Sequence, residues 1–197
     1  MSEPSTVIAY IDLKSPYSYL ALTPARHLAW DCGLTLDWRP LSLDLNEMVG
    51  AVTERSPRQV AKLKYLYMDA RRLAEPQGLT IRAPKQVYDS TVANIGMLYA
   101  QDQGAFFDYT QIAYARFFDR ALDPGDAEAV TAILAEAGVD TAGFAAFLAG
   151  AGQTRLAALA EEALAQGVFG VPTFIHDGEL FWGTDRLPLL RARLENA

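Results

Sequence analysis

The stretch DLKSPYSYLA, residues 12–21, marks a change from strand to helix close to the start of the chain. The preceding run TVIAYID, at 6–12, is apolar with β-branched and aromatic members, which predicts a short buried strand. Ser15 is then a good N-cap and Pro16 a good first helical residue. Apolar residues keep helical spacing until Gly33, so we expect a helix between these points.

The next segment indicates a second strand. In LTLDWRPL, residues 34–41, apolar Leu and Trp alternate with Thr, Asp and Arg, and Pro40 should end the strand. A strand, a helix and a strand in succession form a βαβ unit, for which a parallel, right-handed crossover is the default.

The middle of the chain is helical and its end is β again. Ser56-Pro57 repeats the cap-plus-proline start, and further helices fit 90–103, 107–120, 125–137, 141–148 and 153–166. The runs 171–176 and 179–182 flank Asp177-Gly178, a strong hairpin signal. A helix should close the chain, with Asp185 as its N-cap and Pro188 at its third position.

The order β-α-β, helices, β-β-α is that of an α/β protein with a thioredoxin-like fold and an inserted all-helical subdomain. We expect residues 1–45 and 168–197 to form the thioredoxin-like domain and 46–167 the insertion. In this fold the active residues lie where the first strand meets the first helix. SPYS stands there in place of the C-x-x-C of redox relatives, with Ser15 and Ser18 at the two cysteine positions.

Composition narrows the function. A net charge of −7 argues against general affinity for nucleic acid or an anionic membrane. No apolar run is long enough to span a bilayer, and MSEPST lacks the basic start of a signal peptide, so we expect a cytoplasmic protein. One cysteine, Cys32, and two histidines exclude an intrachain disulfide and argue against a Cys/His metal site, so no metal is expected.

Five stretches carry a family resemblance: DLKSPYSYLA, KLKYLYMDARRLA, YDSTVANIGMLYA, GVFGVPTF and FWGTDRL. Together they resemble the 2-hydroxychromene-2-carboxylate isomerase family, in the DsbA-like branch of thioredoxin folds and close to the kappa-class glutathione transferases. The resemblance covers nearly the whole chain in order. It implies glutathione as cofactor, a serine in place of the redox cysteine, and a homodimer.

Ser15 can act on such a thiol. A helix N-terminus stabilises an anion, and a serine hydroxyl there can donate a hydrogen bond to a thiolate that the ligand brings. Such a bond is worth about 1.5–3 kcal/mol, or roughly one to two units in the pKa of the bound thiol. The alternative is that Ser15 is only an N-cap.

Val171 and Pro172 form the second candidate element. Sequence alone favours a trans bond before Pro172. The resemblance implies a cis bond, with the Val171 backbone facing the cysteinyl part of glutathione as an added strand would. The alternative is a proline that begins an ordinary strand.

Three further residues would bind the ends of glutathione. Thr184 and Asp185 suit the zwitterionic γ-glutamyl end, although Asp185 could be a plain N-cap, and Arg186 should form an ion pair. Lys62 matches a family lysine that meets the glycyl carboxylate. It could instead be a solvated lysine, with Lys64 as a neighbour that could be mistaken for it. The preceding GAVTERSPRQVA lacks the asparagine usual in the family.

Aromatic residues near these elements could wall a pocket for a flat substrate. Tyr17, Tyr88, Phe169 and Trp182 are the aromatic candidates. Tyr88, together with the polar Asn94, lies in the family-like YDSTVAN and is a better candidate for the pocket. We expect Phe169 and Trp182 to pack in the core and His176 to be exposed beside the hairpin turn.

Two classes of function fit this sequence. The first is a glutathione-dependent enzyme, either an isomerase of a small conjugated substrate or a kappa-like transferase that keeps the thioether. The second is a non-catalytic thioredoxin-like module that binds a peptide or another thiol.

Overall fold

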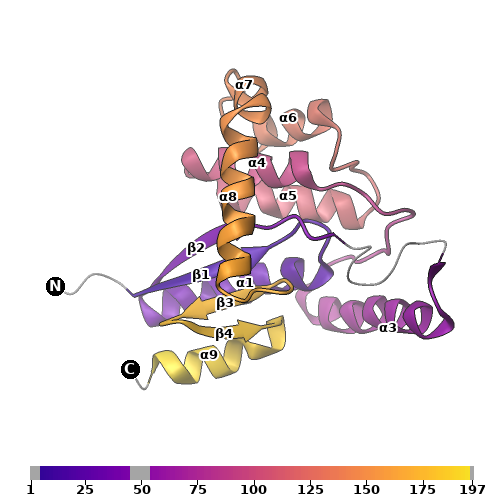
Figure 1. The fold of residues 1–197 in the computed structure, drawn as a ribbon, viewed down its shortest axis with the longest axis vertical. Coiled ribbons are helices and arrows are strands. Elements are labelled where there is room, and N and C mark those ends of the chain that lie inside the picture. Colours follow the sequence, from indigo (N-terminus) through magenta and orange to yellow (C-terminus); the bar gives the residue numbers. More distant parts are fainter. Residues whose placement is uncertain (1–4, 45–53, 196–197) are drawn as a thin grey trace.

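The described residues, 5–44 and 54–195 of a computed structural model, fold around a four-stranded sheet (Figure 1). Its strands are β1 (Thr6–Ile11), β2 (Thr35–Pro40), β3 (Thr173–His176) and β4 (Glu179–Trp182). They lie in the order β2-β1-β3-β4, with β1 parallel to β2 and the other neighbours antiparallel. The expected α/β class, the parallel first unit and the closing hairpin are confirmed.

The helices follow the expected order. The first, α1 (Pro16–Cys32), connects β1 to β2, and α9 (Leu187–Leu194) ends the described chain after a 3₁₀ turn, η3 (Thr184–Arg186). Between β2 and β3 lie α3 (Pro57–Ala74), η2 (Glu75–Gln77), α4 (Thr91–Asp102), α5 (Phe106–Phe118), α6 (Ala127–Glu136), α7 (Phe144–Ala149) and α8 (Ala151–Ala165). The domain boundary at 45/46 lies outside the described residues, and the division into two domains stays a prediction.

Local signals explain where these elements begin and end. The side chain of Ser15 accepts a hydrogen bond from the Ser18 amide at the start of α1, and Gly33, with φ 63°, ends the helix in the left-handed region. In the hairpin, Asp177 and Gly178 have φ 48° and 78°, as a two-residue turn with a primed geometry requires.

Alternating side chains divide the sheet between two apolar layers. Val7, Ala9 and Ile11 of β1 belong to the main core, whereas Tyr10 packs in a smaller cluster with Ala163 of α8. The helix α8 therefore covers one face of the sheet, and α1 and α9 pack on the other (Figure 1).

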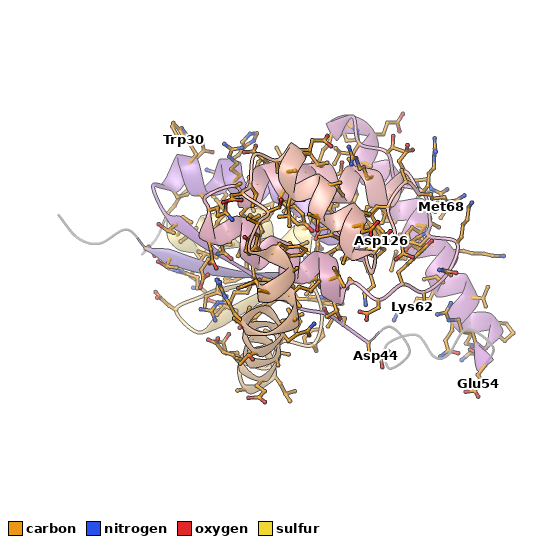
Figure 2. The ribbon with its side chains drawn as sticks, turned by 90° about the horizontal axis from the view of Figure 1, so that it is seen from above. Trp30, Asp44, Glu54, Lys62, Met68 and Asp126 are labelled. Carbon is orange, nitrogen blue, oxygen red and sulfur yellow. The ribbon has the colours of Figure 1, made fainter. Side chains whose placement is uncertain are left out.

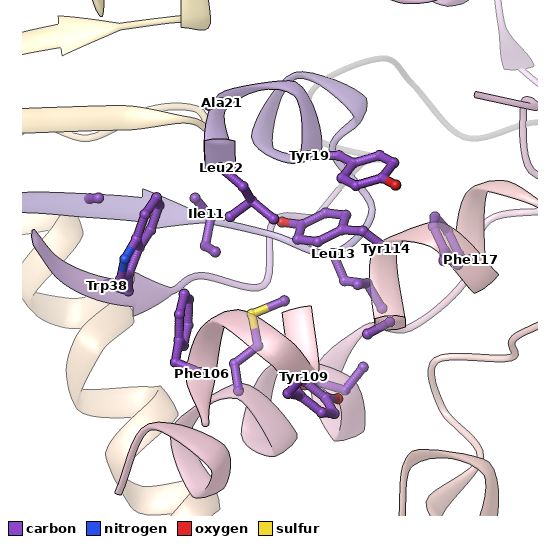
Figure 3. Packing of buried hydrophobic residues seen from close by; sticks show 14 of the residues in the cluster. Ile11, Leu13, Tyr19, Ala21, Leu22, Trp38, Phe106, Tyr109, Tyr114 and Phe117 are labelled. Carbon is purple, nitrogen blue, oxygen red and sulfur yellow. The ribbon is translucent and has the colours of Figure 1, made fainter. Parts of the chain in front are cut away.

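The helical block packs directly against the end of β1. Tyr19 of α1 stacks on Tyr114 of α5 with ring centroids 5.2 Å apart, and Leu13 is buried in the same cluster (Figure 3). Because these rings come from both parts of the chain, the main core is continuous between the sheet and the inserted helices. Within the described ranges, no helix combines the length and the apolar character needed to cross a membrane.

Candidate functional site

Four chain segments meet at one end of the sheet, where β1, β2 and β4 end and β3 begins. Ile11 at the end of β1 pairs with Pro40 at the end of β2, and Tyr10 pairs with Thr173 at the start of β3. Thr173 in turn pairs with Trp182 at the end of β4. The same end of the sheet therefore carries the segments around residues 12–15, 41–44, 171–172 and 183–185. These include the strand ends that the sequence predicted would carry the active residues.

Ser15 lies at the centre of this end of the sheet, after the central strand β1. It has extended backbone geometry and caps α1, its Oγ accepting from the Ser18 amide at 3.1 Å. The same Oγ donates to the carbonyl oxygen of Val171 at 3.3 Å. The capping role is thus confirmed, and it coexists with a half-buried hydroxyl that faces the segment before β3. Ser18 is fully buried, and its hydroxyl accepts from the Asp12 amide at 3.4 Å.

The segment that faces Ser15 has the expected form. The Val171–Pro172 bond is cis, both residues are buried, and the Pro172 carbonyl accepts from the Gly183 amide at 2.9 Å. This last bond joins the start of β3 to the turn that carries Thr184.

Thr184 and Asp185 lie next to the start of α1, but Asp185 is not an N-cap. Thr184 Oγ1 donates to the carbonyl of Tyr17 at 2.8 Å. The expected capping role of Asp185 is wrong, because residues 184–186 form a 3₁₀ turn and α9 begins only at Leu187, directly before Pro188. A proline without an N–H is favoured at a helix start, which moves the helix boundary past Asp185. The Asp185 carboxylate is 71% exposed and pairs with Arg186 at 2.8 Å, and this ion pair was expected.

Tyr17 joins α1 to α3. Its hydroxyl donates to Asp69 Oδ2 at 2.9 Å. Burial raises the pKa of Tyr17 well above its usual value, and the hydrogen bond to Asp69 and the charges of Asp69 and Asp185 raise this pKa further. The phenol therefore stays neutral and remains a donor at any physiological pH. The turn η3, which contains Asp185, packs against α1 through the bond from Thr184 to Tyr17.

Lys62 lies at the periphery. Lys62 is exposed on α3 (Figure 2), and Lys64 on the same helix is exposed too. Within residues 5–44 and 54–195, neither lysine forms an ion pair with a neighbouring acid. Part of the asparagine-free stretch before Lys62 falls in 45–53, outside the described residues.

The structure separates the two pocket candidates of YDSTVAN from each other. Tyr88 is half-buried and meets the Phe117 ring edge-on, with centroids 5.7 Å apart. Asn94 is fully buried, and its amide oxygen accepts from the Leu13 amide while its nitrogen donates to Asp12 and Ser42. Asn94 therefore supports the turn before Ser15 from beneath.

Sequence reasoning missed Asp12, whose carboxylate is almost fully buried. It accepts from the hydroxyl of Ser90 at 2.7 Å and from the amide of Leu43 at 3.0 Å, and it forms an ion pair with Lys14. The only signal in the sequence was an acid directly after an apolar strand and three residues before a helix cap.

Two aromatic residues and a histidine were misplaced. Phe169 and Trp182 are 62% and 50% exposed and lean on each other with centroids 4.8 Å apart, so the expectation of core packing is wrong. Neither residue belongs to the main core or to the small cluster that α8 covers. His176 was expected to be exposed but is only 5% exposed, because it lies within β3.

Two surface hollows formed by the described residues lie away from Ser15. The larger of these two hollows, about 490 Å³, lies at the opposite end of the sheet. Its lining includes Thr6, Arg39, Asp177 and Gly178. The smaller, about 390 Å³, lies on α1 beside Arg26 and Trp30.

Known proteins share this sequence and architecture. Residues 6–195 match the model of the DSBA-like thioredoxin domain. A 2-hydroxychromene-2-carboxylate isomerase of Sphingobium xenophagum is 30% identical over 96% of this chain and 97% of its own. One from Pseudomonas putida is 31% identical over 94% of this chain and 92% of its own.

Solved structures agree. A 2-hydroxychromene-2-carboxylate isomerase superposes with a TM-score of 0.79 at 31% identity, over 97% of this chain and 95% of the other. The cytosolic disulfide reductase DsbM from Pseudomonas aeruginosa, solved with GSH, has a TM-score of 0.64 at 19% identity, over 97% and 98%. The second likeness concerns the fold alone. Because residues 6–195 match the domain model and the relatives at 30–31% identity are isomerases of this type, the chain belongs to the 2-hydroxychromene-2-carboxylate isomerase family and carries the DSBA-like thioredoxin domain.

Proposed function

We propose that this protein is a glutathione-dependent isomerase of the 2-hydroxychromene-2-carboxylate type, acting in the cytoplasm on a small aromatic or conjugated substrate. One observation carries the proposal. The Ser15 hydroxyl stands at the N-terminus of α1 and faces Val171, where a redox relative would present a cysteine. The names of the curated relatives supply the substrate class.

The donor set at Ser15 fits a thiolate. The hydroxyl has one proton, which it donates to Val171 over 3.3 Å, a long distance for a bond between two oxygen atoms. A charged acceptor forms a stronger hydrogen bond than a neutral carbonyl. The Ser15 hydroxyl would therefore donate to a thiolate in preference to the Val171 carbonyl. The dipole of α1 favours the same negative charge.

The other candidates would hold the rest of the tripeptide. The Val171 backbone would pair with the cysteinyl unit, the amide and carboxylate of Asp185 with the γ-glutamyl end near Thr184, and Lys62 with the glycyl carboxylate. Bound glutathione would supply a thiolate that can add reversibly to a conjugated bond. The role of this chain is to keep that sulfur deprotonated and fixed next to the substrate. The same fold in DsbM, solved with GSH, is compatible with this arrangement.

Calorimetry and a turnover assay together test the proposal. Glutathione should bind at millimolar concentration or below, and isomerisation of 2-hydroxychromene-2-carboxylate should require it. S-methylglutathione, which lacks the free thiol, should bind but not support turnover. Isomerisation at the same rate without glutathione would contradict the cofactor. Retention of a thioether product would indicate a transferase, and binding of neither compound would favour a non-catalytic module.

A further inference from the structure

The carboxylate of Asp12, three residues before Ser15, is buried and accepts hydrogen bonds from four donors. It is 1% exposed. Its Oδ1 accepts from the Lys14 amide at 3.2 Å, from Ser90 Oγ at 2.7 Å and from Asn94 Nδ2 at 3.1 Å. Its Oδ2 accepts from the Leu43 amide at 3.0 Å. A buried charge with this many donors fixes its surroundings, because each donor would be costly to leave unpaired.

The bonds of Asp12 set the turn that presents Ser15. The main-chain carbonyl of Asp12 accepts from the Ser15 amide at 2.9 Å and from the Tyr114 hydroxyl at 2.9 Å. Its side chain holds the Lys14 amide inside the same turn. Residue 12 therefore closes the turn with both its main chain and its carboxylate, and Ser15 is the residue at which the turn ends.

The same carboxylate attaches this turn to two other parts of the molecule. Ser90 and Asn94 come from the start of α4, and Leu43 follows β2. The Lys14 ammonium lies 3.7 Å from Asp12 Oδ2 and donates to the Leu43 carbonyl at 2.8 Å, which compensates the buried charge. The start of α4 is thus joined to the turn before Ser15 by Ser90 and Asn94, which both donate to the Asp12 carboxylate, and Asn94 also accepts from the Leu13 amide.

We propose that Asp12 is the positioning residue of the thiol site and that Ser90 of α4 orients Ser15 through it. The inference rests on the proposed function only for the nature of the ligand. A hydroxyl with one proton stabilises a thiolate only when its oxygen is held within hydrogen-bonding distance of the sulfur, so small shifts of the turn matter.

Ser90→Ala tests this better than a change at Asp12, which could prevent folding by leaving several buried donors unpaired. It removes one buried hydroxyl and leaves the charge of Asp12 in place. Thr110→Val is the matched control. Thr110 is equally buried, and its hydroxyl donates to the Phe106 carbonyl at 2.8 Å, within α5. Both variants should lower the midpoint of urea unfolding.

The readout is the thiolate at position 15 itself. In a Ser15→Cys, Cys32→Ser background, the pKa of the introduced thiol follows from the pH dependence of its alkylation by iodoacetamide. Ser90→Ala should raise this pKa by about half a unit to one unit, because the sulfur is held less well at the helix N-terminus and Asp12 loses a compensating donor. Thr110→Val should leave it unchanged.

Two outcomes would overturn the inference: equal thiol pKa values in all three proteins, or the same rise with Thr110→Val as with Ser90→Ala. The measurement uses no glutathione, so it stands even if the proposed cofactor is wrong. In the Ser15 protein, if glutathione does bind, Ser90→Ala should lower kcat severalfold with little change in the KM for glutathione.

Discussion

Ser15 and Val171, separated by 156 residues in the chain, meet through a hydrogen bond of 3.3 Å between the serine hydroxyl and the valine carbonyl. The bond connects the N-terminus of α1 to the segment before β3, the two elements between which a thioredoxin-like protein carries out its chemistry. A hydroxyl in this place can donate to a thiolate but cannot form a disulfide. On the proposed function, this hydroxyl would hold the sulfur of glutathione as an anion.

We expect no disulfide exchange by the natural protein. Its single cysteine, Cys32, lies half-buried at the far end of α1 from Ser15. Reduction of insulin disulfides should thus not exceed the uncatalysed rate. Ser15→Cys should react with oxidised glutathione, releasing one glutathione and keeping the other as a mixed disulfide visible by mass spectrometry. Insulin reduction at thioredoxin-like rates by the unmodified chain would contradict the serine assignment.

Asp185→Ala and Lys62→Ala should each weaken glutathione binding in calorimetry. Both side chains are exposed, so solvent screening limits each effect to about two- to fivefold in Kd. The two would contact opposite ends of the ligand, and their effects should add. Lys64→Ala is the control and should bind normally. If Lys64→Ala weakens binding and Lys62→Ala does not, the assignment of the glycyl contact is wrong.

Local signals predicted most of the fold. The cap at Ser15, the stop at Gly33 and the Asp177-Gly178 hairpin each depend on a few neighbouring residues, and all three are present. The boundary of α9 was wrong because two local rules competed, an acid as N-cap against a proline at the helix start, and Pro188 prevailed.

Burial was harder to predict, because it depends on what the rest of the chain covers. Trp182 and Phe169 look like core residues, but Trp182 ends the edge strand β4, and both side chains are exposed. Asp12 looks like a surface acid, yet side chains far along the chain converge on it. The motif YDSTVAN suggests that Asn94 faces a pocket. Its buried bonds to Leu13 and Asp12 join residues about 80 positions apart in the chain, which a local motif does not reveal.

We expect a homodimer that uses α3. Tyr65 and Met68 on this helix are 55% and 41% exposed, and Met68 is labelled in Figure 2, whereas Tyr67 on the same helix is half-buried. An exposed apolar helix face of this kind favours a symmetric interface. Sedimentation at micromolar concentration should give about twice 21.6 kDa, and Met68→Glu should shift the protein toward the monomer. Trp30→Glu, at an 87% exposed residue of α1, should not. A monomeric wild-type protein would contradict this prediction.

Alkaline pH should destabilise the fold in part through Tyr67. Burial raises the pKa of Tyr67 from 10.0 to about 12, so between these values the unfolded chain loses this proton while the folded chain keeps it. The protonated Tyr67 contributes on the order of 2 kcal/mol to the free energy of unfolding. This contribution is complete below pH 10 and is lost as the pH rises to about 12. Tyr67→Phe should show a shallower fall in its urea midpoint over this range. Equal slopes would mean that Tyr67 is not protected from ionisation.

The most direct test of the account is the thiolate absorbance of bound glutathione, followed by ultraviolet difference spectroscopy in the wild-type protein and in Ser15→Ala. If the Ser15 hydroxyl stabilises the thiolate, the wild-type complex should show thiolate at neutral pH. Ser15→Ala should raise the bound thiol's pKa by roughly one to two units and lower turnover more than affinity. Equal thiolate absorbance and equal turnover in the two proteins would contradict the account and leave Ser15 as a helix cap alone.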